Sequence, residues 1–357
     1  MSELIEGLII KAQSGFFTVH TEEGDFTCRL RGRLKEEWRD TDLVAVGDQV
    51  LISRVEDGGR IEGMIEEIQE RERALARLAP SAGRGSRHWT RRGYLSEREQ
   101  VIIANPDHVV FVFACAQPEP RLRMLDRLLV GAELQDIPAI VCANKVDLVG
   151  QEEAHELFDI YDEVGYRVVY TSAKTGAGVD ELHGLLVGRI SALIGPSGAG
   201  KTSLLNRMQP GLGLRVREVS RATRKGRHTT VVPQLVPLDG GSRAGPTDED
   251  SGRPSARPPG DNDPTTEQGW VADTPGLKAL ALFDMDPEEV DAYFPDIAPL
   301  VANCRFSDCS HTVEPGCAVK HALEEREVSE HRYESYVRLR EEHQKLADMY
   351  WWGIDEE

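Results

Sequence analysis

The clearest chemical signal in the sequence is a glycine-rich segment that ends in lysine and threonine. Residues 195–202 read GPSGAGKT, which matches the phosphate-binding pattern G-x-x-x-x-G-K-S/T. A predicted strand precedes the segment and a predicted helix follows it, so backbone N–H groups would meet phosphate oxygens at a helix N-terminus. This context disfavours a chance glycine-rich turn. Lys201 would reach the β- and γ-phosphates, and the Thr202 hydroxyl would bind Mg²⁺. The expected phosphate contacts are Gly195, Pro196, Ser197, Gly198, Ala199, Gly200, Lys201, Thr202 and Ser203.

Two short motifs earlier in the chain predict which base the site recognises. Residues 144–147 read NKVD and residues 171–174 read TSAK, each at the end of a predicted strand. The Asp147 carboxylate can accept both N1–H and the N2 amine of guanine, and the Ala173 N–H can donate to O6. Adenine lacks O6 and the N2 amine, so these loops favour guanine. The expected base-site residues are Asn144, Lys145, Asp147, Ser172, Ala173 and Lys174.

A third motif predicts the magnesium and γ-phosphate contacts. Residues 273–276 read DTPG after a predicted strand. Asp273 would hold Mg²⁺ through water, and the Gly276 N–H would sense the γ-phosphate. One hydroxyl of the adjacent Thr229 and Thr230 would complete the Mg²⁺ shell; we favour Thr230, although the sequence alone does not decide between them.

A cysteine and histidine cluster near the C-terminal end predicts a metal site. The spacing is Cys304-x4-Cys309-x-His311-x5-Cys317. Three thiolates and one imidazole suit a closed tetrahedral Zn²⁺ site, and four protein ligands leave no open position for a catalytic zinc. The alternatives are core cysteines or a disulfide. The remaining cysteines, which we read as small core residues, are Cys28, Cys115 and Cys142.

The elements that must position these residues fall into three regions. Residues 1–75 contain five short predicted strands, typical of a small closed barrel that is OB-like or SH3-like. Residues 99–283 alternate strands and helices, as in a doubly wound α/β sheet. Within this region, residues 239–269 are rich in proline and glycine and are predicted to be a disordered insertion at a hairpin tip. Residues 284–357 hold the Cys/His cluster and a predicted helix over 329–350.

The charge distribution limits the nucleic-acid partners of the chain. Its 357 residues include 42 Lys and Arg against 61 Asp and Glu, a formal net charge of −19. RNA binding would therefore need local basic patches. One such patch is a basic arm over residues 76–98 with its flanking arginines, which is either an RNA contact or a solvated linker. Another is the segment from Arg215 to Arg227, which contains one acidic residue.

All elements of a GTPase are thus present, but NKVD and SAK precede the phosphate loop, the threonines and DTPG. This order is a circular permutation, and together with the barrel and the Cys/His cluster it closely resembles the RsgA (YjeQ) family of ribosome-assembly GTPases. The resemblance implies a GTPase that binds the small (30S) ribosomal subunit and its rRNA, acts in late maturation, and is stimulated by the subunit. The family has a histidine implicated in catalysis in a G-x-H-T-T context, which corresponds here to His228; the alternative for His228 is an RNA-facing or solvated loop residue. The expected catalytic residues are His228, Thr230 and Gly276.

One departure from Ras-like enzymes supports an alternative function. Leu277 stands where those enzymes place the glutamine that orients the attacking water, and leucine cannot hydrogen-bond to water. The chain could therefore be a GTP-gated RNA- or ribosome-binding module with negligible turnover. An ATP-dependent RNA enzyme is disfavoured by Asp147 and Ala173.

The remaining expectations concern location and assembly. No apolar run approaches the roughly 20 residues that a membrane helix needs, and the N-terminal residues do not resemble a secretory signal. Six cysteines in a chain of this length do not indicate a disulfide scaffold. We therefore expect a cytoplasmic protein without a membrane partner, and a monomer, since nothing in the sequence requires a dimer.

Overall fold

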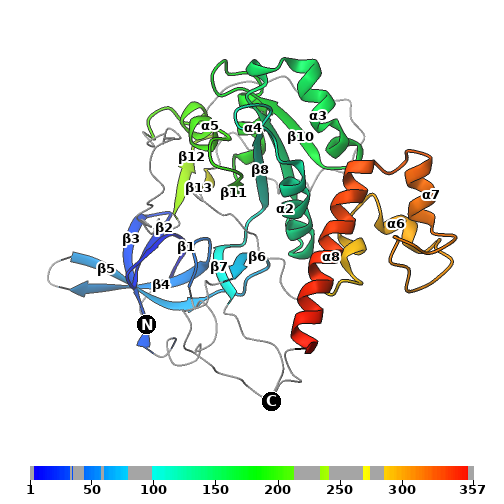
Figure 1. Ribbon diagram of the computed structural model, residues 1–357. Helices are drawn as coiled ribbons and strands as arrows, with labels where there is room; N and C mark the ends of the chain where they lie inside the picture. The colour runs from blue at the N-terminus through cyan, green and yellow to red at the C-terminus, as the bar shows by residue number, and fades with distance from the viewer. Residues whose placement is uncertain are drawn as a thin grey trace.

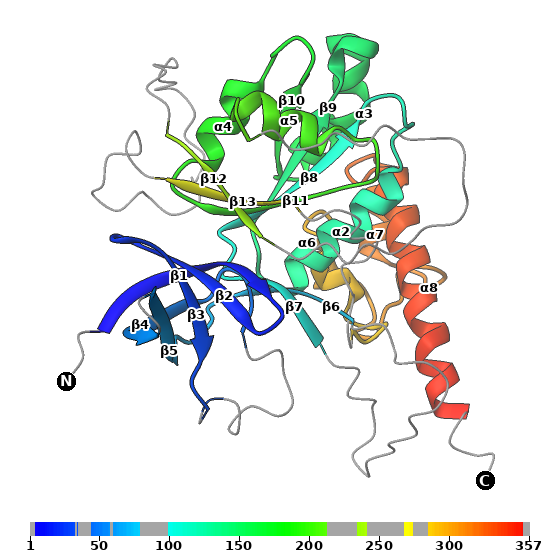
Figure 2. The same cartoon turned by 90° about the vertical axis from the view of Figure 1, so that its left-hand side faces the viewer.

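The structure is a computed structural model that describes residues 4–32, 34, 44–57, 60–78, 99–212, 234–240, 268–273 and 285–352. Several predicted features lie outside these residues: most of the basic arm, the segment that contains His228 and Thr230, most of the insertion, and Gly276. The described parts form a barrel, a central sheet with helices on both faces, and a helical C-terminal domain (Figures 1 and 2).

The N-terminal strands close into a five-stranded barrel. They are β1 (Leu4–Gln13), β2 (Phe16–Thr21), β3 (Gly24–Leu30), β4 (Gln49–Asp57) and β5 (Arg60–Ile68). Their order is β1-β2-β3-β5-β4, with β3 and β5 parallel and β4 pairing back to β1. This is the Greek-key arrangement of an OB barrel, so the OB-like prediction is confirmed. Alternate side chains of the strands fill the interior, among them Ile9, Val19, Val50, Ile52 and Ile65.

A short hairpin joins the barrel to the central sheet. Strands β6 (Ala74–Leu78) and β7 (Glu99–Ala104) pair antiparallel, so the sequence of the basic arm runs between two hydrogen-bonded strands. The barrel turn at Gly47 packs against the end of β7, where an added Cβ would lie 2.1 Å from the Ala104 carbonyl oxygen. Arg71 donates from Nε and Nη2 to both oxygens of the buried Asp48 at 2.7 and 2.8 Å, so this arginine stabilises the junction instead of extending the basic arm.

The central sheet has six strands in the order β10-β9-β8-β11-β13-β12. They are β8 (His108–Ala114), β9 (Ala139–Asn144), β10 (Arg167–Thr171), β11 (Ile190–Ile194), β12 (Leu235–Leu238) and β13 (Gly269–Asp273). Only β12 is antiparallel, and it pairs with β13 as the predicted hairpin. The chain leaves β8 toward one edge and β11 toward the other, so a topological switch point lies between these two strands.

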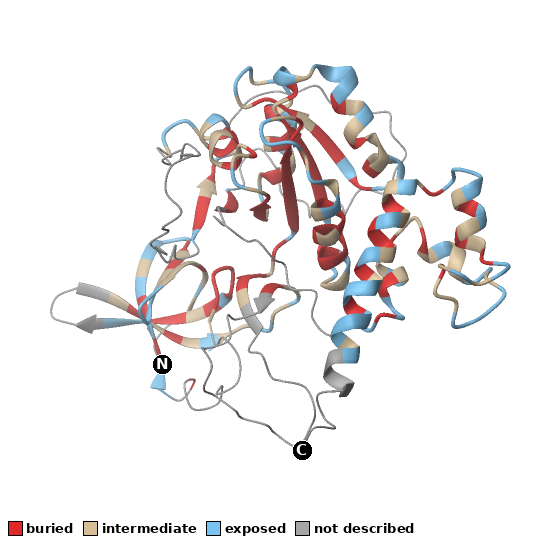
Figure 3. Cartoon of the chain, viewed as in Figure 1, coloured by how far each residue is buried: buried red, intermediate tan, exposed pale blue. Residues whose placement is uncertain are grey.

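Helices cover both faces of the sheet, as predicted for a doubly wound fold. One apolar cluster joins the sheet to α2 (Leu122–Leu134) and α3 (Gln151–Glu163). Another joins it to α4 (Val179–Leu186) and α5 (Lys201–Met208). The strands between them are the most completely buried part of the molecule (Figure 3).

The C-terminal domain packs along α2 through its longest helix. It contains η2 (Val290–Tyr293), α6 (Ala298–Val301), α7 (Ala318–Glu324) and α8 (Glu330–Trp352). Helix α8 matches the predicted helix over 329–350. Arg332 on α8 is 1% exposed and donates to Asp126 on α2 at 2.8 Å and to Asp296 at 2.7 Å. Its guanidinium also lies 4.7 Å from the Phe294 ring centroid. No helix in the described part of the chain is long and apolar enough to cross a membrane.

Candidate nucleotide and metal sites

The predicted nucleotide motifs converge at one edge of the central sheet. Strands β8, β9, β10, β11 and β13 are parallel, and NKVD, SAK, the phosphate loop and DTPG each begin at or directly after the carboxyl end of one of them. Ligands of open α/β sheets bind outside this edge, at the switch point. Motifs separated by more than 100 residues in the sequence therefore face one site.

The phosphate loop links β11 to α5 and approaches its neighbours closely. Gly195 has φ +157°, and an added Cβ would lie 2.0 Å from the Val112 carbonyl oxygen. Gly200 has φ +102°, and an added Cβ would lie 2.2 Å from Asn144 Nδ2. Only glycine fits at either position. Lys201 is largely buried, and its Nζ donates to the carbonyls of Gly195 and Pro196 at 2.7 and 3.1 Å, so the ammonium lies inside the loop where phosphates would bind.

Asn144 joins the phosphate loop to the predicted base site. The side chain is fully buried; Nδ2 donates to the Ala199 carbonyl at 2.8 Å. Its Oδ1 accepts from the Thr171 hydroxyl at 3.1 Å and from the Ala173 N–H at 3.4 Å. One amide therefore connects three loops. Thr171 was not among the predicted residues, because its hydroxyl acts through Asn144.

The Asp147 carboxylate is oriented by the SAK loop. The Ser172 hydroxyl donates to Asp147 Oδ1 at 2.6 Å, and Lys174 Nζ lies 3.7 Å from Oδ2. The hydrogen bond from Ser172, followed by the charge of Lys174, holds the pKa of Asp147 below its usual value, so the group stays an acceptor at neutral pH. An ionised carboxylate can accept two parallel hydrogen bonds, which is what guanine N1–H and N2 offer.

Lys145 takes a left-handed backbone conformation with φ 67°. Its Nζ donates to the Gln117 carbonyl in the loop after β8. Burial lowers the pKa of this lysine. The contact fixes the far end of the side chain, so the aliphatic stem bridges two loops beside Asp147. The structure thus places an apolar surface where a base would lie.

The predicted magnesium residues are described in part. Asp273 is the last residue of β13, and in the sheet register it is paired with Leu193 of β11, just before the phosphate loop. Thr202 is half-buried at the second position of α5. A hydroxyl and a carboxylate are suitable Mg²⁺ ligands, so these residues fit the predicted ion. Thr230, His228 and Gly276 lie outside the described residues.

The Cys/His cluster brings its four predicted ligand atoms close enough together to hold a metal ion. The ligand atoms of Cys304, Cys309, His311 and Cys317 all lie within 4.8 Å of one another. His311 Nδ1 lies 3.5 Å from Cys304 Sγ and 3.4 Å from Cys317 Sγ, and these two sulfurs are 4.0 Å apart. Tetrahedral zinc with ordinary bond lengths needs about 3.5 Å between sulfur and nitrogen and about 3.8 Å between sulfurs. All described cysteines are free thiols, so no disulfide competes with this arrangement.

Residues around the cluster hold the histidine in one orientation. His311 Nε2 lies 3.0 Å from Asp291 Oδ2, which leaves Nδ1 to face the thiols. The Tyr333 hydroxyl donates to the His311 carbonyl at 2.7 Å, and the Tyr336 hydroxyl donates to the Ser310 carbonyl at 3.0 Å. A carboxylate behind a metal-binding histidine is a common supporting group. Asp291 was not predicted, because it lies 20 residues before the histidine and has no motif of its own.

Comparison with known proteins gives the same picture. A family model described as RsgA GTPase matches residues 88–244, and one described as RsgA N-terminal domain matches residues 6–65. A small ribosomal subunit biogenesis GTPase RsgA of Gemmatimonas aurantiaca is 41% identical over 344 residues, which cover 96% of this chain and 98% of that protein. A protein of the same description from Moorella thermoacetica is 40% identical over 333 residues, 93% of this chain and 95% of that protein.

Solved structures agree over nearly the whole chain. YjeQ from Thermotoga maritima matches with a TM-score of 0.69 at 31% identity, covering 96% of this chain and 99% of that one. YloQ, described as a circularly permuted GTPase, matches with a TM-score of 0.64 at 29% identity, covering 96% of both chains.

Proposed function

Because the chain belongs to the RsgA family, we propose that it is a GTPase that binds the small ribosomal subunit and acts in its late maturation. The observation that best supports this function is the position of Asn144, which joins the phosphate loop to both guanine loops through one buried amide. Subunit binding would stimulate hydrolysis of GTP to GDP and phosphate. The domains would be an OB-like barrel (1–75), a basic arm (76–98), a permuted GTPase domain (99–283) and a zinc-binding domain (284–357).

The residues of the site would share the reaction as follows. The loop from Gly195 to Ser203 binds the phosphates through backbone N–H groups, and Lys201 neutralises their charge. Thr202, Thr230 and Asp273 would hold Mg²⁺, which would supply charge stabilisation of the phosphates in the transition state.

The group that positions the attacking water would be a residue that the structure does not describe. Leu277 has no polar group to orient it, so we assign this role to His228, with the Gly276 N–H at the γ-phosphate. An imidazole can accept a proton from water or orient it through a hydrogen bond.

We further propose that the Cys/His cluster binds one structural Zn²⁺. Four protein ligands close the coordination sphere, so the ion would stabilise the loop around it without taking part in hydrolysis. The basic arm and the segment 215–227 would contact rRNA phosphates, in which case subunit binding weakens steeply as salt increases. We expect the protein to act in the cytoplasm as a monomer.

Leu277 favours a second candidate, a GTP-gated ribosome-binding protein with negligible turnover. Single-turnover GTP hydrolysis with and without isolated small subunits distinguishes the two. Strong stimulation supports the GTPase; equally slow turnover in both conditions supports the gated binding protein.

An Asp147→Asn variant tests the base assignment in the same assay. It should lose activity with GTP and gain activity with xanthosine triphosphate. The asparagine side chain has an NH₂ donor, and xanthine presents a carbonyl acceptor where guanine has its N2 amine. Unchanged use of GTP would overturn the guanine site.

A further inference from the structure

The barrel contacts the hairpin β12–β13, and this hairpin connects directly to two segments of the proposed catalytic machinery. Gln234, at the start of the hairpin, follows Thr230 by four residues in the sequence, and β13 ends at Asp273. We call residues 224–231 and 273–277 the switch segments. A displacement of the hairpin would therefore move the end of one switch segment and the start of the other together.

Three kinds of contact join the barrel to this hairpin. Lys11 of β1 forms an isolated antiparallel bridge with Gln234. The His20 ring of β2 meets the Trp270 ring of β13 edge to face, with centroids 4.9 Å apart and an interplanar angle of 64°. Leu8, Ile10 and Ala12 of β1 pack against the core cluster that contains Leu235 and Trp270. We call this set of contacts the barrel–hairpin seam, and both cartoon views show the barrel directly beside the hairpin (Figures 1 and 2).

The seam is apolar and specific at its centre. Trp270 is 8% exposed and Leu235 is 4% exposed, although they lie on the two strands at the edge of the sheet. A hydrogen bond orients the His20 ring, because its Nδ1 lies 2.7 Å from Asp25 Oδ1. An edge-to-face aromatic contact depends on ring geometry as well as on burial. The ring contact therefore joins β2 directly to Trp270 of β13.

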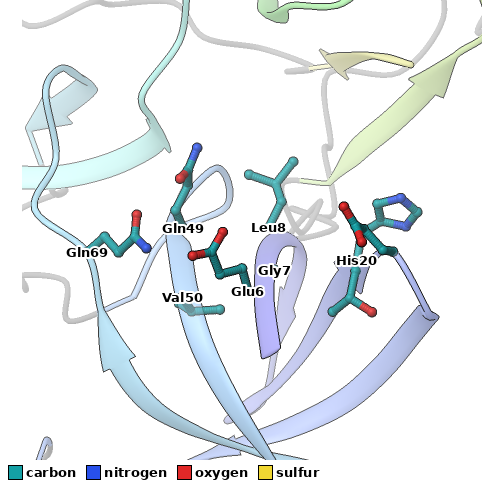
Figure 4. A pocket seen from close by; sticks show the side chains of 9 residues that line it. Glu6, Gly7, Leu8, His20, Gln49, Val50 and Gln69 are labelled. Carbon is teal, nitrogen blue, oxygen red and sulfur yellow. The ribbon is translucent and has the colours of Figure 1, made fainter. Parts of the chain in front are cut away.

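A pocket of about 320 Å³ opens beside the seam, and the described residues that line it belong to the barrel, among them Glu6, Gln49 and Gln69. Figure 4 shows Leu8 and His20 on the side of this pocket toward the hairpin, and the two glutamines on the other side. No described residue of the central domain lines this pocket, and the described contacts of the barrel with the hairpin lie along β1 and the end of β2. The turn at Gly47 supplies a separate anchor to β7.

From this geometry we propose that the barrel–hairpin seam couples the barrel to the nucleotide state of the switch segments. Binding of the γ-phosphate would change the position of the hairpin through Asp273 and Thr230. The hairpin would in turn change the position of β1 and β2 through the seam. Such coupling is reciprocal. If the bound nucleotide changes the affinity of the barrel for a partner by some factor, the partner changes the affinity of the site for that nucleotide by the same factor. The assignment of the switch residues rests on the proposed function; the contacts do not.

Hydrogen exchange of the whole chain tests the coupling without ribosomal subunits. With GDP or with a non-hydrolysable GTP analogue bound, exchange in residues 4–13 should differ by about fivefold or more, the lower range of typical coupling. Residues 60–68 of β5, which take no part in the seam, should not change. Equal exchange of residues 4–13 in the two nucleotide states would overturn the proposal.

Variants of the seam give the second arm of the test. His20→Ala and Trp270→Phe should each reduce the nucleotide-dependent difference in exchange, with basal GTP hydrolysis retained. His155→Ala is a matched control, because it removes another ring contact, with Tyr170, on α3. A difference that survives in both seam variants would also overturn the proposal.

Stimulation by small subunits separates the two claims. If wild-type hydrolysis is stimulated, the seam variants should lose most of that stimulation; full stimulation in both would count against the seam. If wild-type hydrolysis is not stimulated, the proposed function fails, and the exchange experiment still decides the coupling.

Discussion

The hydroxyl of Ser172 orients the carboxylate that we assign to guanine, and its removal gives a graded test of that assignment. Ser172 is fully buried; its Oγ donates to Asp147 Oδ1 at 2.6 Å and accepts from the Thr175 N–H at 3.1 Å. A Ser172→Ala variant keeps the backbone and the phosphate loop. It removes the shortest hydrogen bond of the Asp147 side chain.

The size of the effect follows from the surroundings of Asp147. A hydrogen bond to a charged group contributes about 1.5–3 kcal/mol. The Asp147 side chain is 13% exposed and Lys174 Nζ remains 3.7 Å away, so water and the ammonium recover part of the loss. We expect GDP binding to weaken by about 1–2 kcal/mol, which is about 5- to 30-fold.

Titration calorimetry with GDP measures this change directly. Ser191→Ala is the control: Ser191 is equally buried, and its Oγ lies 3.0 Å from His108 Nε2 inside the sheet. The control should bind GDP within about twofold of wild type, because it touches no part of the site. Wild-type affinity in Ser172→Ala would refute the claim that this hydroxyl orients the base-recognising carboxylate.

Four further outcomes are expected. Gly200→Ala should abolish nucleotide binding, measured by fluorescent GDP titration, since its Cβ would overlap a buried amide. Arg332→Met should lower the melting temperature strongly, because the buried Asp126 and Asp296 both lose their guanidinium partner, while Asp126 keeps Ser335 and His331; the loss is about 3–5 kcal/mol. Chelation of the proposed Zn²⁺ should unfold the C-terminal domain, seen as lost helical circular dichroism, and leave GDP binding intact. Burial, with a smaller effect of Arg189, lowers the pKa of His108 to about 4 from an unfolded value near 6.5. Its neutral form therefore contributes stability above pH 6.5 that is lost as pH falls toward 4, and a His108→Gln variant should show a weaker dependence of melting temperature on pH over this range.

The nucleotide site was largely predictable because its motifs are local and follow parallel strands. Each loop contains its chemistry within four to eight consecutive residues, and parallel strands bring their carboxyl ends to one edge. Helix α3 was not predicted, although Ala154, Phe158 and Tyr161 are buried at helical spacing. The charged residues between them obscure that pattern.

Contacts between distant segments could not be predicted. Asp126 and Arg332 are 206 residues apart, so only the packing of α8 on α2 reveals their ion pair. The same holds for His20 and Trp270 at the seam. Strands β6 and β7 escaped prediction because their arginine-rich flanks resemble a linker, and their pairing partners are separated by the length of the arm.

The register of the β12–β13 hairpin also has a practical consequence for labelling the protein. Leu238 pairs directly with Gly269, so the two strand ends that flank the intervening 30 residues lie at neighbouring positions. The free energy of closing such a loop depends only weakly on its length; replacing it with about four residues would change stability by about 2 kcal/mol, in the stabilising direction. The same two strand ends can therefore accept a fluorescent reporter domain whose termini lie close together. Such a fusion would report on the hairpin from the end of the strands opposite Asp273.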